Sequence, residues 1–220
     1  VSGCLKFPMY PRLMQEEREP GSKPAAAPPL AAIIVVGHDD IGALERSLRG
    51  LAENSVLPGL HVHFLVPESM DAAEDTALRR LPLFQEGRHS WTLTRFSTPP
   101  DFAASLGEVA AAHPGSDIAL IAPGVDLPFA WDARLAKAAY AEPNIAAAVP
   151  MCDISPLYAL LGERTRAEPR FDAALVDRAA YCMGERGYYE IPRIHPLCAY
   201  IRRDALDIAL PRLADTGEPR

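Results

Sequence analysis

Acidic, turn-forming segments follow several apolar runs of this sequence, and they are the places where its residues could do chemistry. Asp126 comes soon after the apolar run 117–122 and shares a turn with Gly124. A carboxylate there can bind a hard divalent cation, which in turn neutralises a diphosphate. A hard cation needs several oxygen ligands, and the sequence offers only one carboxylate here. The alternative is that Asp126 is a turn residue or caps the helix predicted from Trp131.

Three further groups of residues have both a chemical and a structural interpretation. His61 and His63 project from the same face of a predicted strand and could ligate zinc. The sequence places no third ligand beside them, so a solvent-facing strand edge is the alternative. Arg202 and Arg203 could meet a phosphate group or be surface charges at a helix start. Cys152 has no base paired with it, which favours a buried structural thiol.

Motifs for several other chemistries are missing from the sequence. The first predicted strand leads into Gly-His-Asp-Asp at 37–40 rather than GxGxxG, and GxxxxGK[ST], GxSxG and HExxH do not occur. The four cysteines form no CxxC pair, which argues against a zinc ribbon and favours a reducing, cytoplasmic location. The net charge of −7 argues against a nucleic-acid partner. No apolar run approaches the roughly 20 residues of a transmembrane segment.

The elements that must position these residues alternate between strands and helices. Apolar runs predict strands at 31–36, 60–66, 91–96, 117–122, 145–149 and 197–201. Helical spacing predicts helices at 41–51, 71–80, 101–109, 131–141, 171–181 and 203–210. The alternation predicts an α/β fold, a three-layer α/β/α sandwich with a mostly parallel central sheet. Because ligands of such sheets bind at the carboxyl ends of the strands, the loops 37–40, 67–71 and 123–128 are the candidate site.

The chain has 220 residues, of which 49% are hydrophobic, and this suffices for one domain with a sizeable core. Residues 1–30 are rich in proline and charge and predict a flexible tail or linker. The alternative is a segment that docks on this domain or on a partner. Residues 31–220 are predicted to form the domain itself.

The order of the local motifs resembles that of family 2 glycosyltransferases, which have the A-type nucleotide-diphospho-sugar transferase fold. Segment 33–39, Ile-Ile-Val-Val-Gly-His-Asp, is similar to the first strand of that family. Segment 117–128 is similar to the strand that delivers its DxD motif, and Tyr-Ile-Arg-Arg at 200–203 to a later strand and helix. The resemblance covers about residues 31–210.

The resemblance implies transfer of a sugar, with inversion, from a nucleotide diphosphate donor to the hydroxyl of a saccharide or other acceptor. It implies a divalent cation, Mg²⁺ or Mn²⁺, with Asp126 as its ligand. Glu68 stands where the second strand of the family ends in acidic residues that read the nucleotide base. The nucleotide-sugar site implied in this way consists of Gly37, His38, Asp39, Glu68, Gly124 and Asp126.

Departures from the family pattern leave a second hypothesis open. The first Asp of DxD is replaced by Gly124, and the catalytic residue is unknown. In the family, the base is a carboxylate downstream of the Arg-Arg helix, where this sequence has only Asp215 and Glu218 after Leu210. The alternative is therefore a catalytically inactive glycosyltransferase-like binding or scaffolding domain. A further domain or partner chain could supply the missing part. A different nucleotide-binding α/β enzyme is disfavoured by the missing phosphate motifs.

Overall fold

The structure, a computed structural model, describes residues 28–37, 40–81, 89–97, 102–150 and 197–215, together with Leu175 and Asp177. In chain order its elements are β1 (Leu30–Val35), α2 (Ile41–Asn54), β2 (His61–Pro67), α3 (Ala72–Arg79), β3 (Ser90–Phe96), α5 (Phe102–Ala112), β4 (Asp117–Ile121), α6 (Trp131–Ala139), β5 (Ala147–Ala148), β6 (Cys198–Ile201) and α9 (Arg203–Asp215). Most of the predicted tail, the predicted helix at 171–181 apart from Leu175 and Asp177, and Cys152 lie outside the described residues.

Six strands form one sheet in the order β3-β2-β1-β4-β6-β5. Strands β3, β2, β1 and β4 are parallel, whereas β6 runs antiparallel to both β4 and β5. The mostly parallel sheet is therefore confirmed. Because the first four strands share a direction, the segments that follow them all leave from one edge of the sheet, which we call the carboxyl edge. We call the opposite edge the amino edge.

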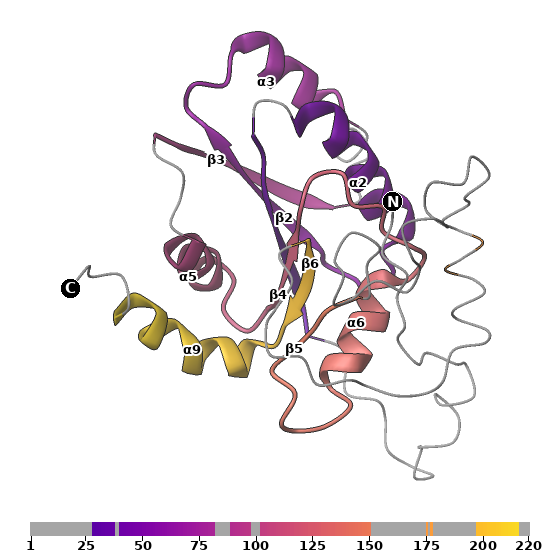
Figure 1. The fold of residues 1–220 in the computed structure, drawn as a ribbon, viewed down its shortest axis with the longest axis vertical. Helices are drawn as coiled ribbons and strands as arrows, with labels where there is room; N and C mark the ends of the chain where they lie inside the picture. The colour runs from indigo at the N-terminus through magenta and orange to yellow at the C-terminus, as the bar shows by residue number, and fades with distance from the viewer. Residues whose placement is uncertain are drawn as a thin grey trace, which may run out of the picture.

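Helices cover both faces of this sheet, which confirms the predicted three layers. Helices α2, α3 and α6 lie on one side of the sheet, and α5 and α9 lie on the other (Figure 1). The first face packs Ile34 of β1 and Phe64 of β2, and the second packs Ile33 and Leu65 of the same strands. The alternate residues of β1 and β2 thus enter two separate cores, as the period of a strand requires.

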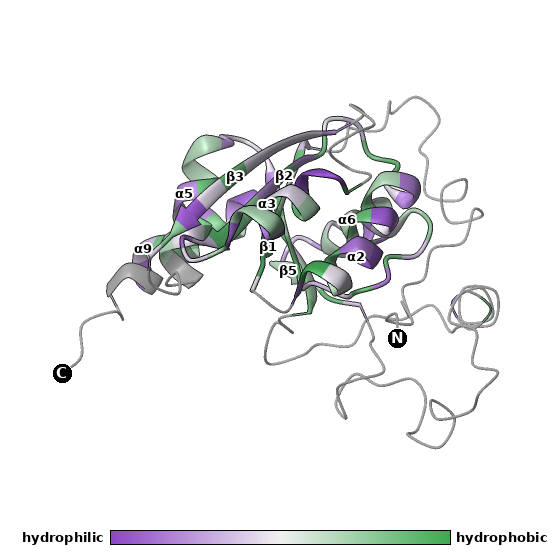
Figure 2. Ribbon diagram, turned by 90° about the horizontal axis from the view of Figure 1, so that it is seen from above, coloured by the Kyte–Doolittle hydropathy of each residue, from purple (hydrophilic) through white to green (hydrophobic). Residues whose placement is uncertain are grey.

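The helices are amphipathic where they meet the sheet. Helices α2 and α6 carry hydrophilic and hydrophobic residues side by side (Figure 2). In α2 the buried residues include Leu44, Leu48 and Leu51, which recur at helical spacing. No helix in the described part of the chain combines the length and the apolar character that a membrane crossing needs.

A close contact between α2 and the segment after β4 fixes the course of that segment. A Cβ added to Gly50 would lie 2.9 Å from Leu127 Cβ and 3.0 Å from Leu127 N. The side-chain amide of Asn54 donates to Leu127 O at 2.7 Å, and Ala130 N donates to Asn54 O at 2.8 Å. Gly50 therefore allows the segment that starts at the carboxyl edge to run against α2.

This contact gives a stability prediction for two glycines of the same helix. We expect Gly50→Ala to lower the free energy of unfolding by about 1–3 kcal/mol, because the new methyl group would press on the backbone of Leu127. Gly42→Ala is the control, since a Cβ there meets nothing within 4 Å. It is expected to raise the free energy of unfolding by up to about 1 kcal/mol through helix propensity. Urea unfolding measures both, and an equal effect of the two substitutions would contradict the contact.

Candidate functional site

The turn after β1 brings a carboxylate to the middle of the carboxyl edge. Gly37 N donates to Asp40 Oδ2 at 2.8 Å, and Asp40 N donates to Gly37 O at 3.2 Å. Asp40 is at the N-cap position of α2, but its side chain makes no cap hydrogen bond to that helix. The site residues His38 and Asp39 predicted from the sequence lie outside the described residues.

The loop after β2 holds Glu68 at the same edge. Glu68 N donates to Phe96 O at 2.8 Å, so the backbone of the loop is tied to the end of β3. The side chain is exposed, and within the described ranges it has no hydrogen-bond or ion-pair partner. The exposed position of Glu68 is compatible with the nucleotide-binding role that the sequence predicts, and that role stays a prediction.

The loop after β4 packs against the first half of α2. The hydroxyl of Ser47 donates to Ala122 O at 3.3 Å. Gly124 has a φ of 85°, in the left-handed region that favours glycine. A Cβ on Gly124 would lie 3.2 Å from Ala43 Cβ and 3.4 Å from Arg46 Nη2. Glycine at position 124 is thus explained by both the backbone conformation and the neighbouring helix.

Asp126 follows on this loop as a half-buried carboxylate. Among the residues that the structure describes, its side chain has no hydrogen-bond or ion-pair partner. The N-cap of α6 is Ala130, and that helix has no side-chain cap hydrogen bond. The alternative in which Asp126 caps the helix from Trp131 is therefore wrong, and the carboxylate is available to a cation.

The sheet order brings these loops together. Strand β1 lies between β2 and β4, so the segments with Gly37, Glu68 and Asp126 leave from three adjacent strands of one edge. Arg46 joins them through its approach to Gly124, although no motif of the sequence indicates it. Only the packing of the loop after β4 on α2 shows that the guanidinium of Arg46 lies beside this loop, because the two segments are far apart in the sequence.

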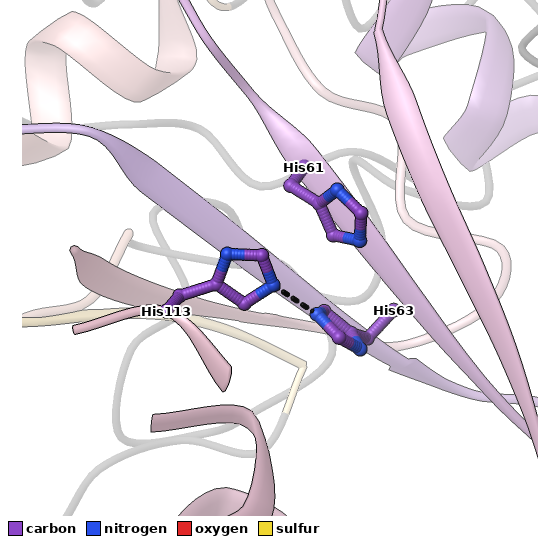
Figure 3. A group of neighbouring side chains, drawn as sticks. All are labelled: His61, His63 and His113. Carbon is purple, nitrogen blue, oxygen red and sulfur yellow. Dashed lines mark hydrogen bonds between the residues drawn. The ribbon is translucent and has the colours of Figure 1, made fainter. Parts of the chain in front are cut away.

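Three histidines cluster at the amino edge, on the face covered by α5 and α9. His61 and His63 lie in the first half of β2, and His113 directly follows α5 (Figure 3). Their ring centroids are 4.5–4.7 Å apart, and His63 Nε2 lies 2.5 Å from His113 Nε2. His63 is buried, and β2 is an inner strand, so the solvent-facing interpretation of this pair is wrong for His63.

The environment keeps these imidazoles neutral. Burial first, and then the neighbouring His61 and His113, lower the pKa of His63 from 6.5 to about 4. Burial also lowers the pKa of His61 and of His113, with His113 as a further cause for His61. Arg203 faces the cluster from α9, donating to His113 O at 3.0 Å.

A buried carboxylate organises the neighbouring part of the amino edge. Asp117, the first residue of β4, accepts hydrogen bonds from the hydroxyls of Tyr140 at 2.9 Å and Tyr200 at 2.5 Å. It also accepts from Arg203 N at 2.8 Å. Burial and the hydrogen bond to Asp117 raise the pKa of both tyrosine hydroxyls well above the usual value. These contacts join β4, β6, α6 and α9 at one point.

Arg202 and Arg203 take part in this structural arrangement. The guanidinium of Arg202 lies 4.7 Å from the centroid of the Tyr140 ring and forms an ion pair with Asp204. Arg203 forms an ion pair with Asp207 at 2.7 Å. Since β6 runs antiparallel to β4, both arginines lie at the amino edge, away from the loops of the candidate site. A phosphate bound at the carboxyl edge is therefore not their ligand.

Comparison with solved structures finds a likeness in fold. No family model matches this sequence, and no curated protein matches it significantly. Among solved structures, a similar one is the mannosyltransferase PcManGT from Pyrobaculum calidifontis, in complex with GDP-Man and Mn²⁺. The TM-score is 0.53 and the sequence identity 17%, over 90% of this chain.

The chain has the fold of this glycosyltransferase. It spans about half of that protein, 51% of the mannosyltransferase chain. At 17% identity the likeness concerns the fold, and the assignment to family 2 stays a prediction. The mannosyltransferase structure contains Mn²⁺, and the described part of our chain contains a group of three histidines that could hold a metal ion.

The lowered pKa of His63 predicts how stability depends on pH. Between pH 6.5 and about 4 the unfolded chain binds a proton at His63 that the folded chain does not bind. The free energy of unfolding should therefore fall as the pH drops through this window. Urea unfolding in the presence of a chelator measures it, and His63→Gln should flatten the dependence. If the free energy of unfolding depended on pH in the same way in the wild type and in His63→Gln, the prediction would be wrong.

Proposed function

We propose that this chain binds a nucleotide-diphosphate sugar at its carboxyl edge and belongs to a glycosyltransferase. The observation that carries the proposal is Asp126, a half-buried carboxylate without a partner in the described part of the chain. It lies on the loop after β4, at the edge where ligands of parallel sheets bind. The likeness in fold to a mannosyltransferase that holds GDP-Man and Mn²⁺ supports the proposal.

The residues at this edge suit a diphosphate and a hard cation. Mg²⁺ is commonly held by one or two carboxylates together with substrate phosphates, so Asp126 with a bound diphosphate is a fitting set of oxygen donors. Arg46 lies beside Gly124 on the loop of Asp126 and favours an anion, whereas the carboxylate of Asp40 at the N-cap of α2 opposes one. Asp126 would hold the Mg²⁺ or Mn²⁺, which when bound stabilises negative charge on the departing diphosphate.

In the proposed reaction, a hydroxyl oxygen of the acceptor attacks the anomeric carbon of the sugar. The bond from that carbon to the diphosphate oxygen breaks with inversion, and the nucleoside diphosphate leaves with the electron pair. A carboxylate takes the hydroxyl proton as general base. Glu68 and Asp39 line the nucleotide pocket in this proposal, and the general base is unassigned.

The second candidate is a domain that binds the donor without transferring the sugar. Gly124 favours it, because the position where the family has its first DxD carboxylate has no side chain. The two candidates differ in one measurement. An enzyme hydrolyses or transfers the bound sugar and releases nucleoside diphosphate, whereas a binding domain returns the donor intact.

Substitution of Asp126 tests donor binding. We expect the wild-type chain to bind GDP-Man, or a uridine- or thymidine-diphosphate sugar, more tightly with Mn²⁺ or Mg²⁺ than with a chelator. Asp126→Asn should weaken the cation-dependent binding about tenfold or more, a loss of at least about 1.4 kcal/mol. Isothermal titration calorimetry measures this effect. Glu53→Gln, an exposed carboxylate of α2, is the control and should bind like wild type. If no nucleotide sugar binds to the wild-type chain, the proposal is wrong.

Placing the missing first carboxylate of the DxD pattern at position 124 should destabilise the fold without improving donor binding. Gly124→Asp is expected to lower the free energy of unfolding because φ is 85° and the new Cβ meets Ala43 and Arg46. Gly59→Asp has a similar φ of 74° with nothing within 4 Å of the new Cβ, so it isolates the backbone cost. We expect Gly124→Asp to be the more destabilised of the two in urea and to gain no affinity for the donor. A stable variant with tighter donor binding would contradict this interpretation.

A further inference from the structure

We propose that His61, His63 and His113 form a binding site for Zn²⁺ at the amino edge of the sheet, independent of the proposed donor site. Each histidine offers one ring nitrogen, and these nitrogens all lie within 4.8 Å of one another. The rings converge from two elements that are distant in sequence, and His63 and His113 point toward each other (Figure 3). The site would tie the start of β2 to the end of α5.

His63 and His113 require only a small adjustment to admit the ion, and His61 must move closer to them. Zn–N bonds are about 2.0–2.1 Å, so two nitrogens on one tetrahedral zinc lie roughly 3.3 Å apart. His63 Nε2 and His113 Nε2 are 2.5 Å apart, where one N–H donates to the other nitrogen. An entering ion would replace this proton and separate the rings by about 1 Å. Three histidine ligands leave a fourth position for water, as in open zinc sites.

Hydroxyl groups from β3 orient the third ligand. His61 Nδ1 lies 2.7 Å from Ser90 Oγ, and His61 Nε2 lies 2.9 Å from Thr92 Oγ1. One of these hydrogen bonds must give way when His61 binds the ion. The other can stay and hold the ring, in the manner of outer-shell partners of metal-bound imidazoles.

The ligand atoms of the histidine group distinguish its ion from the Mg²⁺ or Mn²⁺ of the proposed nucleotide-sugar site. The group contains imidazoles and no carboxylate among the described residues, and imidazole suits Zn²⁺ better than the oxygen-seeking Mg²⁺. The lowered pKa of each ring keeps it in the neutral, ligating form. The cation of Arg203 next to His113 opposes a second positive charge, but its ion pair with Asp207 offsets this effect.

Co²⁺ as a coloured substitute for Zn²⁺ tests the site directly. The wild-type chain, stripped with a chelator, should develop the visible absorption of tetrahedral Co²⁺ at one equivalent, and added Zn²⁺ should abolish it. Zn²⁺ should also raise the thermal unfolding temperature. His113→Gln and His61→Gln, which change half-buried residues, should lose the absorption and the thermal shift while keeping the circular dichroism of the wild type. His89→Gln, a histidine outside this group, is the matched control and should keep both.

Two cross-checks separate this site from the proposed function. Asp126→Asn should bind Co²⁺ like wild type, and His113→Gln should keep cation-dependent donor binding. Absence of a Co²⁺ spectrum in the wild type would overturn the zinc site and leave a hydrogen-bonded histidine cluster. An unchanged spectrum in folded His113→Gln and His61→Gln would overturn it as well. Loss of the Co²⁺ spectrum in Asp126→Asn would show that the ion binds at the donor edge instead.

Discussion

The parallel pairing of β1 between β2 and β4 is the interaction on which the rest of the structure depends. This strand is hydrogen-bonded along both sides, and its residues are buried on both faces from Leu30 to Ile34. A strand so placed has no polar surface, which is why its sequence is a continuous apolar run. Its position also makes the loops after β2, β1 and β4 neighbours at one edge.

The two edges of the sheet have different chemistry. At the carboxyl edge, the carboxylates of Glu68 and Asp126 have no hydrogen-bond or ion-pair partner among the residues that the structure describes, and the guanidinium of Arg46 lies beside Gly124. At the amino edge, Asp117 accepts hydrogen bonds from Tyr140 and Arg203 N, Arg202 lies over the ring of Tyr140, and Arg203 donates to His113 O, so these charged groups join separate elements. The histidine cluster is the exception there, because its nitrogens meet one another and two hydroxyls rather than an ion-pair partner.

The loop after β4 shows how packing limits the candidate site. It lies along α2 because Gly124 and Gly50 let its backbone approach the helix. The positive φ of Gly124 and the closeness of Ala43 disfavour a side chain at position 124, where the resemblance to family 2 glycosyltransferases would place the first carboxylate of DxD. The same approach brings Arg46 to the loop, so the positive charge lies beside the position that lacks a carboxylate.

The sequence by itself determined the order of strands and helices, the layers and the edge that carries the loops, because apolar periodicity is a local property. It also indicated Glu68 and Asp126, since both follow predicted strands directly. The tertiary structure decided the rest. It brought His113 to His61 and His63 across about fifty residues, placed Arg46 beside Gly124, and turned Arg202 and Arg203 to the amino edge by reversing β6. Spacing along a chain cannot show such contacts, because they depend on which strand each crossover reaches and on the direction in which it then runs.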